Sequence, residues 1–284
     1  MRTHTIHGHD NVALHVVEHG SATAPAILLV HGFAQCHLCW QLQYADARLQ
    51  EFRLVAFDLR GHGSSDKPQT PQSYVDGAAL AEDIRCVIEA LNLQRPVLTA
   101  WSYAGLIACD YLRHVGTTNL SGLALIAARS KVGTAAARQM SGSLFLSLVP
   151  GLVARDADAR VAAITAFLHE LTVSPLPLTD FYQMLGYNIS VPPHVCAALL
   201  GRQADNDDVL STLDIPTWIV HGDADTSILP VMAEHHAKII PNAKLSIYSN
   251  VGHAPFYERS DLFNRELYEF AMLCCADEQT TETT

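Results

Sequence analysis

VLTAWSYAGLIACDYL, residues 97–112, has the sequence pattern that is most informative about the fold of this chain. An apolar run at residues 97–101 turns through Ser102 into a segment that favours a helix from Tyr103 onward. A strand that passes into a helix without a loop strains the backbone of the residue between them and lifts its side chain clear of the sheet. The pattern therefore predicts an exposed serine beside a helix N-terminus, whose free N–H groups can receive a negative charge.

Two later loops carry the base and the acid that a serine nucleophile needs. An apolar run at residues 217–220 ends in a loop with Asp223 and Asp225, and a later strand-like run ends in a loop with His253. A serine hydroxyl is a weak nucleophile until a neighbouring imidazole accepts its proton, and a carboxylate holds that imidazole in position. His253 is therefore the predicted base for Ser102, and one of the two aspartates is the acid.

In this order, the serine, aspartate and histidine motifs resemble those of the α/β-hydrolase superfamily. An upstream stretch adds to the resemblance, because AILLVHGFAQ, residues 26–35, is a buried strand that ends in His31-Gly32-Phe33. The chain is similar in particular to the lidded esterases, cofactor-free haloperoxidases and C–C hydrolases. The resemblance spans roughly residues 5–275.

The resemblance implies further roles. In the family, the acid lies three residues after the glycine that ends its strand, and counting from Gly222 gives Asp225. The triad is then Ser102, Asp225 and His253. The backbone N–H groups of Phe33 and Tyr103 are expected to form the oxyanion hole.

The residues two positions before and two positions after Ser102 depart from the family pattern. The usual glycines two positions either side of the nucleophile are Ala100 and Ala104 in this chain. Alanine is still small, so the turn is expected to survive with altered walls. A serine nucleophile also excludes the dehalogenase and epoxide hydrolase branches, which attack with aspartate.

Composition excludes several classes of partner. The chain has 284 residues, 49% apolar composition and a formal net charge of -11, which argues against nucleic acid and anionic membranes. The N-terminal MRTHTIHGHD lacks the apolar run of a signal peptide, and no stretch reaches ~18 uninterrupted apolar residues. We therefore expect a cytoplasmic location and a small-molecule substrate, and the sequence leaves the oligomeric state open.

The seven cysteines lack the regular spacing of a disulfide framework. Cys36-His37-Leu38-Cys39 resembles half of a zinc site, but no second Cys-x-x-Cys completes a tetrahedral set. We expect free thiols, no bound metal and no cofactor.

Strand-like runs alternate with amphipathic helices, which predicts a mostly parallel eight-stranded sheet flanked by helices. The expected strands lie at residues 3–7, 12–19, 26–30, 53–58, 97–101, 120–127, 217–220 and 244–248.

The alternation stops from about Arg129 to Leu213, where the pattern becomes helical without strands and is broken at Pro150 and at later proline pairs. We expect a helical lid there, and a last helix that ends near Met272. The predicted division is a hydrolase core at residues 1–128 and 213–275, a lid at 129–212 and a disordered tail at 276–284.

The predicted function is hydrolysis of a small, apolar carboxylic ester or lactone through an acyl-enzyme, with no cofactor. Apolar residues of the lid and its surroundings are expected to bind the substrate: Trp101, Phe145, Phe181, Met184 and Ile228. Three alternatives stay open. They are a C–C bond hydrolase of ring-cleavage diketones, a perhydrolase side activity, and a ligand sensor that retains the triad but turns over slowly.

Overall fold

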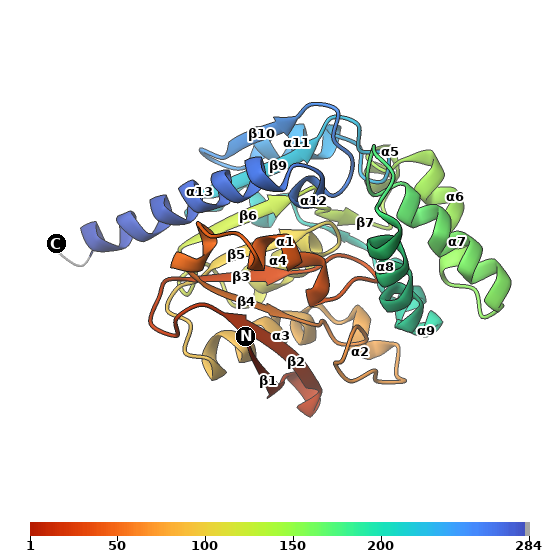
Figure 1. Ribbon diagram of the computed structural model, residues 1–284, viewed down its shortest axis with the longest axis horizontal. Coiled ribbons are helices and arrows are strands. Elements are labelled where there is room, and N and C mark those ends of the chain that lie inside the picture. Colours follow the sequence, from red (N-terminus) through yellow and green to blue (C-terminus); the bar gives the residue numbers. More distant parts are fainter. Residues whose placement is uncertain (282–284) are drawn as a thin grey trace.

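The computed structural model describes the backbone of residues 1–281 and the side chains of residues 1–276, and it has one large sheet (Figure 1). The strand order is β1-β2-β4-β3-β5-β6-β9-β10. Only the β1–β2 and β2–β4 pairs are antiparallel. The strands are β1 (Arg2–His7), β2 (Ala13–His19), β3 (Ala26–Val30), β4 (Arg53–Phe57), β5 (Val97–Trp101), β6 (Gly122–Ile126), β9 (Thr217–Gly222) and β10 (Lys244–Tyr248). This confirms the predicted eight-stranded, mostly parallel sheet.

The central strands are buried along their whole length, as their continuous apolar sequences require. Every residue of β3, β4, β5 and β6 is buried. Helices cover the sheet in two contacting groups, with α13 (Ser260–Thr281) and α1 (Gln41–Tyr44) in front in Figure 1. In the other group, α4 (Ala104–His114) packs against α3 (Gly77–Ala90) and α10 (Asp207–Leu210), and α10 also contacts α11 (Val231–Ile239).

Helices fill most of the segment between β6 and β9, and five of them lie together at one end of the sheet (Figure 1). They are α5 (Ala135–Gln139), α6 (Ser143–Leu152), α7 (Ala157–His169), α8 (Leu178–Ser190) and α9 (Pro193–Leu200). We call this segment the helical insertion. Two details correct the expectation of a strandless, proline-broken segment. A short antiparallel ribbon of β7 (Lys131–Val132) and β8 (Ala204–Asp205) joins its two ends, and Pro150 lies inside α6.

The last helix runs further than the sequence pattern indicated. We expected α13 to end near Met272 and a disordered tail at 276–284, but the helix continues through Thr281. A packed helix adds one backbone hydrogen bond for each further residue, and alanine, glutamate and glutamine are good helix formers. Residues 282–284 of the predicted tail lie outside the described part. Within the described residues, no helix combines the length and apolar character needed to span a bilayer.

Candidate active site

Ser102 occupies the sharp turn between β5 and α4. Its φ angle is +58°, in the left-handed region that a non-glycine residue rarely adopts, which confirms the strained turn. The turn is held by Ser102 N donating to Ile126 O at 2.9 Å and by Ser102 O accepting from Arg129 N at 2.9 Å. Chain segments also approach closely at Gly105, where a Cβ atom would lie 2.7 Å from Arg129 O. Glycine at position 105 therefore keeps the start of α4 clear of the Arg129 backbone.

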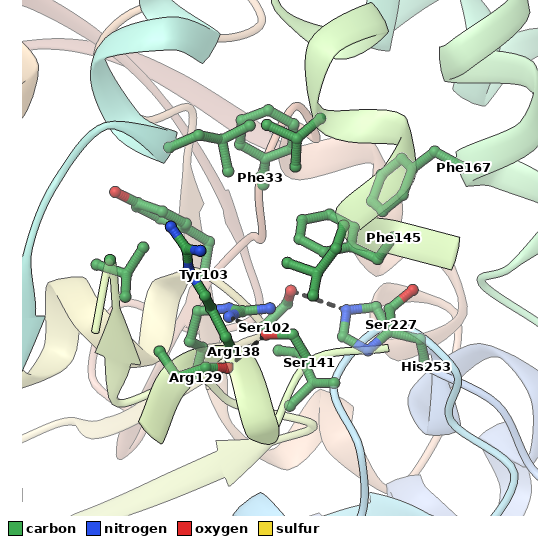
Figure 2. A pocket seen from close by; sticks show the side chains of 17 residues that line it. Phe33, Ser102, Tyr103, Arg129, Arg138, Ser141, Phe145, Phe167, Ser227 and His253 are labelled. Carbon is green, nitrogen blue, oxygen red and sulfur yellow. Dashed lines mark hydrogen bonds between the residues drawn. The ribbon is translucent and has the colours of Figure 1, made fainter. Parts of the chain in front are cut away.

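Three side chains from three strand ends meet above this turn, and Figure 2 shows two of them, Ser102 and His253. His253 Nε2 lies 2.8 Å from Ser102 Oγ, and His253 Nδ1 lies 2.7 Å from Asp225 Oδ2. An ionised carboxylate only accepts hydrogen bonds, so His253 Nδ1 carries the proton and Nε2 is free to accept one from the serine hydroxyl. Ser102, His253 and Asp225 are all buried, with 8%, 2% and 2% of their surface exposed. The expectation of an exposed serine was therefore wrong, because residues of the helical insertion wall the cavity above Ser102. The sequence thus predicted three residues that the fold places in one hydrogen-bonded line.

Asp225 is fixed from several directions. Its Oδ1 accepts backbone N–H groups of Ser227 at 2.8 Å and Ile228 at 3.0 Å, and its Oδ2 lies 3.0 Å from His221 Nε2. Burial opposes ionisation, but electrostatic attraction to the imidazoles of His253 and His221, together with their hydrogen bonds, outweighs it and holds the pKa of Asp225 below its usual range. His221 was missed from the sequence, although it stands one position before the glycine that ends β9.

The other aspartate of this loop has a different place. Asp223 Oδ1 accepts a hydrogen bond from Asn250 N at 2.6 Å, and Asp223 N donates to Tyr248 O at 3.0 Å. The side chain is exposed. Asp223 therefore links two turns of the backbone, and Asp225 is the aspartate that contacts the imidazole.

The two residues expected to supply the oxyanion donors, Phe33 and Tyr103, lie near Ser102. Phe33 follows β3 and Tyr103 precedes α4, and both border the same cavity as the serine. The loop of Phe33 approaches the nucleophile closely at Gly32, where a Cβ atom would lie 2.9 Å from Ser102 Cβ. Glycine at this position lets two backbone segments converge on one point.

Two buried imidazoles support that loop. Leu59 N donates to His31 Nε2 at 3.0 Å, and Ala34 N donates to His62 Nε2 at 3.2 Å. Burial lowers the pKa of His31 to about 4 and that of His62 to about 3, so both rings are neutral and can accept these bonds. His31 and His62 therefore have the same structural role, which is to accept a backbone hydrogen bond.

A cavity of about 340 Å³ opens above Ser102 and His253. Much of its wall is apolar and comes from the loops and the helical insertion: Phe33, Phe145, Val149, Phe167, Leu200 and Ile228. Phe145 and Ile228 border the cavity as expected.

Three other residues that were expected to bind substrate do not line this cavity. The Trp101 indole lies behind the triad, where its Nε1 donates to His253 O at 2.9 Å. Phe181 stacks on His169 with ring centroids 5.0 Å apart, and Met184 borders a separate small hollow. Both belong to α8, which packs on α7. Helical periodicity identifies a buried face, but it does not identify the neighbour that buries it.

The cavity is less apolar than the sequence predicted, because two arginines line it. Arg129 directly follows the β6 region and has 7% of its surface exposed, whereas Arg138 on α5 is exposed. Arg129 Nη1 donates to Ser141 Oγ at 2.8 Å, and its guanidinium lies 5.4 Å from the Phe145 ring centroid. The place of Arg129 in the cavity wall was not predicted, since no local pattern in the sequence shows where its side chain turns.

The described residues bring one group of metal-ligating side chains together. His15, His37 and Asp58 have ligand atoms within 4.8 Å of one another. Asp58 Oδ1 already pairs with His37 Nδ1 at 2.8 Å, and its Oδ2 accepts a backbone N–H. Burial raises the pKa of Cys36 to about 12 and that of Cys39 well above its usual value. These two cysteines are therefore protonated thiols, which bind metals poorly.

Comparisons with known proteins show the family of this chain. Residues 25–260 match the family described as alpha/beta hydrolase fold. The AB hydrolase superfamily protein YisY of Bacillus subtilis (strain 168) is 27% identical over 271 residues, which cover 94% of this chain and 98% of that protein.

Two solved structures of esterases are similar over nearly the full length. The esterase from Rhodococcus sp. ECU1013 has a TM-score of 0.88 and 33% identity, covering 96% of this chain and 99% of that one. The esterase from Exiguobacterium antarcticum has a TM-score of 0.83 and 25% identity, covering 95% and 100%. The chain therefore belongs to the α/β-hydrolase family, and its full-length similarity to esterases makes it a hydrolase of that family.

Proposed function

We propose that the protein is a serine hydrolase that cleaves carboxylic esters or lactones through an acyl-enzyme. One observation carries the proposal: Ser102 Oγ, His253 and Asp225 form an unbroken hydrogen-bonded line at the base of a cavity. A buried serine in a strained turn has no structural need for an imidazole nitrogen aimed at its hydroxyl. The esterase relatives support the same reaction class.

In the first half of the reaction, Ser102 Oγ attacks the ester carbonyl carbon as His253 Nε2 takes its proton. Asp225 stabilises the imidazolium that forms. The carbonyl oxygen becomes an oxyanion, which the N–H groups of Phe33 and Tyr103 stabilise by hydrogen bonds. The imidazolium then returns the proton to the leaving alcohol, the C–O bond breaks, and the acyl group stays on Ser102.

In the second half, water replaces the alcohol. His253 takes a proton from the water, and the resulting hydroxide attacks the acyl carbon. Collapse of the second oxyanion releases the carboxylic acid and returns the proton to Ser102 Oγ. The products are one alcohol and one acid, and no cofactor is consumed.

Turnover of an ester panel tests this proposal. We expect repeated cycles on p-nitrophenyl butyrate and on a small lactone, and a loss of ~10⁴- to 10⁶-fold in kcat for Ser102→Ala. A ring-cleavage diketone in the same panel tests the C–C hydrolase alternative. A single slow acylation without further cycles would instead identify a ligand sensor, and full activity in Ser102→Ala would refute the nucleophile.

A further inference from the structure

The charge of the cavity is opposite to the charge of the protein. The chain has 29 acidic residues against 18 lysines and arginines, yet of these residue types the ones that line the cavity are both arginines, Arg129 and Arg138. Figure 2 shows both arginines on the side of Ser102 away from His253. A positive wall inside an acidic protein concentrates anions at that point.

The protein itself uses little of the Arg129 guanidinium. One of its five N–H groups donates to Ser141 Oγ, and no carboxylate of the described residues lies within ion-pair distance of it. Asp225 is the acid whose field acts on Arg129, but that carboxylate is already engaged by two imidazoles and two backbone N–H groups.

A buried charge without a partner is costly, so this arrangement needs an explanation. Burial lowers the pKa of Arg129 to about 10, which still leaves the side chain protonated at neutral pH. If Arg129 only connected the core to the helical insertion, its hydrogen bond to Ser141 and its contact with the Phe145 ring would be sufficient. An apolar side chain could supply the second contact without a charge.

We propose that the natural substrate carries a carboxylate, which binds to Arg129 while the ester group lies at Ser102. This inference rests on the proposed hydrolysis and narrows its substrate class to anionic esters. A guanidinium presents paired N–H groups that match the two oxygens of a carboxylate. Arg138, exposed on α5, adds a second positive charge along the same wall. Arg129 is the buried cation of the cavity lining, so its one charge matches a substrate group with one negative charge.

Matched pairs of esters test the proposal. The monoethyl ester of adipic acid carries a free carboxylate on the acyl side. In the matched compound the ethyl ester is kept and that carboxylate is replaced by a primary amide, which has a similar shape without the charge. The acetate ester of γ-hydroxybutyrate and its amide place the same difference on the alcohol side. The measured quantity is the ratio of kcat/KM for the acid to kcat/KM for the amide in each pair, which tells which side of the ester carries the anion.

We expect the wild-type ratio to exceed one in one of the two pairs. Arg129→Met should lower that ratio by about 10- to 100-fold, because a hydrogen-bonded charge pair is lost. Arg129→Lys should restore part of it. Arg155→Met is the matched control, since Arg155 is an exposed arginine of the same insertion that does not line the cavity. Equal losses on acid and amide, or ratios below one in both pairs, would overturn the proposal.

Binding to an inactive protein separates this inference from the proposed reaction. Monoethyl adipate and the acetate ester of γ-hydroxybutyrate are titrated calorimetrically into Ser102→Ala, alone and combined with Arg129→Met. We expect the second substitution to raise the Kd of one of these esters by about 10- to 100-fold. If the wild-type protein hydrolysed no ester but this difference appeared, the reaction would be wrong and the anion site would stand. If Arg129→Met left both Kd values unchanged, the anion site would be wrong.

Discussion

At the scale of single residues, the structure distinguishes two aspartates that lie two positions apart. Asp225 Oδ2 is 2.7 Å from His253 Nδ1, whereas Asp223 bonds the backbone of Asn250. Asp225→Asn should lower kcat by ~10²- to 10⁴-fold, because an amide can donate to Nδ1 and so favours the wrong tautomer of the imidazole. Asp223→Asn should change kcat little, since its amide oxygen can still accept the bond. Steady-state kinetics on p-nitrophenyl butyrate compares the two variants, and a larger loss in Asp223→Asn would move the acid to that residue.

Gly32 gives a second prediction at this scale. A methyl group at this position would lie 2.9 Å from Ser102 Cβ and 3.3 Å from Trp101 O, so either the loop or the nucleophile must shift. Displacing an oxyanion donor typically lowers kcat by ~10²- to 10³-fold, and we expect that range for Gly32→Ala.

Gly186→Ala is the control, because a Cβ atom there would meet nothing within 4 Å. Its kcat should equal that of the wild-type protein. Both variants are checked for folding by circular dichroism. Undiminished kcat in a folded Gly32→Ala variant would show that the loop after β3 does not serve the oxyanion.

At the scale of elements, α6 contributes side chains to the cavity wall, whereas α8 contributes none. Phe145 on α6 borders the cavity, whereas Phe181 on α8 stacks on His169. Phe145→Ala should shift the preference among p-nitrophenyl esters towards longer acyl chains, by ~1 to 3 kcal/mol per added methylene that finds room. Phe181→Ala should leave the profile unshifted. Values of kcat/KM from acetate to octanoate measure both profiles, and a shift confined to Phe181→Ala would place α8 at the substrate.

The strands and the triad could be predicted from sequence for a common reason. A strand buried on both faces is a continuous apolar run, and the residues just after β5, β9 and β10 must meet at the same sheet edge. The positions of Ser102, Asp225 and His253 directly after these strands therefore predicted that the three side chains lie close together.

The insertion could not be predicted in the same detail. Its helices were visible as apolar periodicity, but periodicity leaves open which face meets the cavity, and Phe181 and Met184, which were expected at the cavity, do not line it. Arg129 was missed because the direction of a long side chain depends on Ser141 and Phe145, which come from a different element. Two-residue strands such as β7 and β8 are too short to give a pattern.

At the scale of the whole molecule, buried imidazoles make stability depend on pH. Burial lowers the pKa of His31 to about 4, and those of His62 and His236 to about 3, from an ordinary value of 6.5. Between 6.5 and about 4, the unfolded chain binds protons that the native protein does not. The free energy of unfolding therefore falls as the pH drops through this window, by at most about 1.4 kcal/mol per pH unit for each histidine.

Urea denaturation at several pH values across this window measures the slope. Burial raises the pKa of Asp83 and Asp110 above 3.8, which acts in the opposite sense near the acidic end, so the clearest slope lies close to 6.5. His236→Gln should flatten the slope, because it removes one of the three imidazoles. A free energy of unfolding that is constant or rises as the pH falls from 6.5 would contradict this prediction.

The central claim is that Ser102 is the residue that becomes acylated, and covalent trapping tests it most directly. The protein is incubated with a fluorophosphonate, and the adduct is located by intact-mass and peptide mass spectrometry. We predict one adduct per chain, on Ser102, and a strongly slowed reaction in His253→Ala, because the serine then lacks its base. An adduct on another serine, or no adduct in the folded wild-type protein, would contradict the claim.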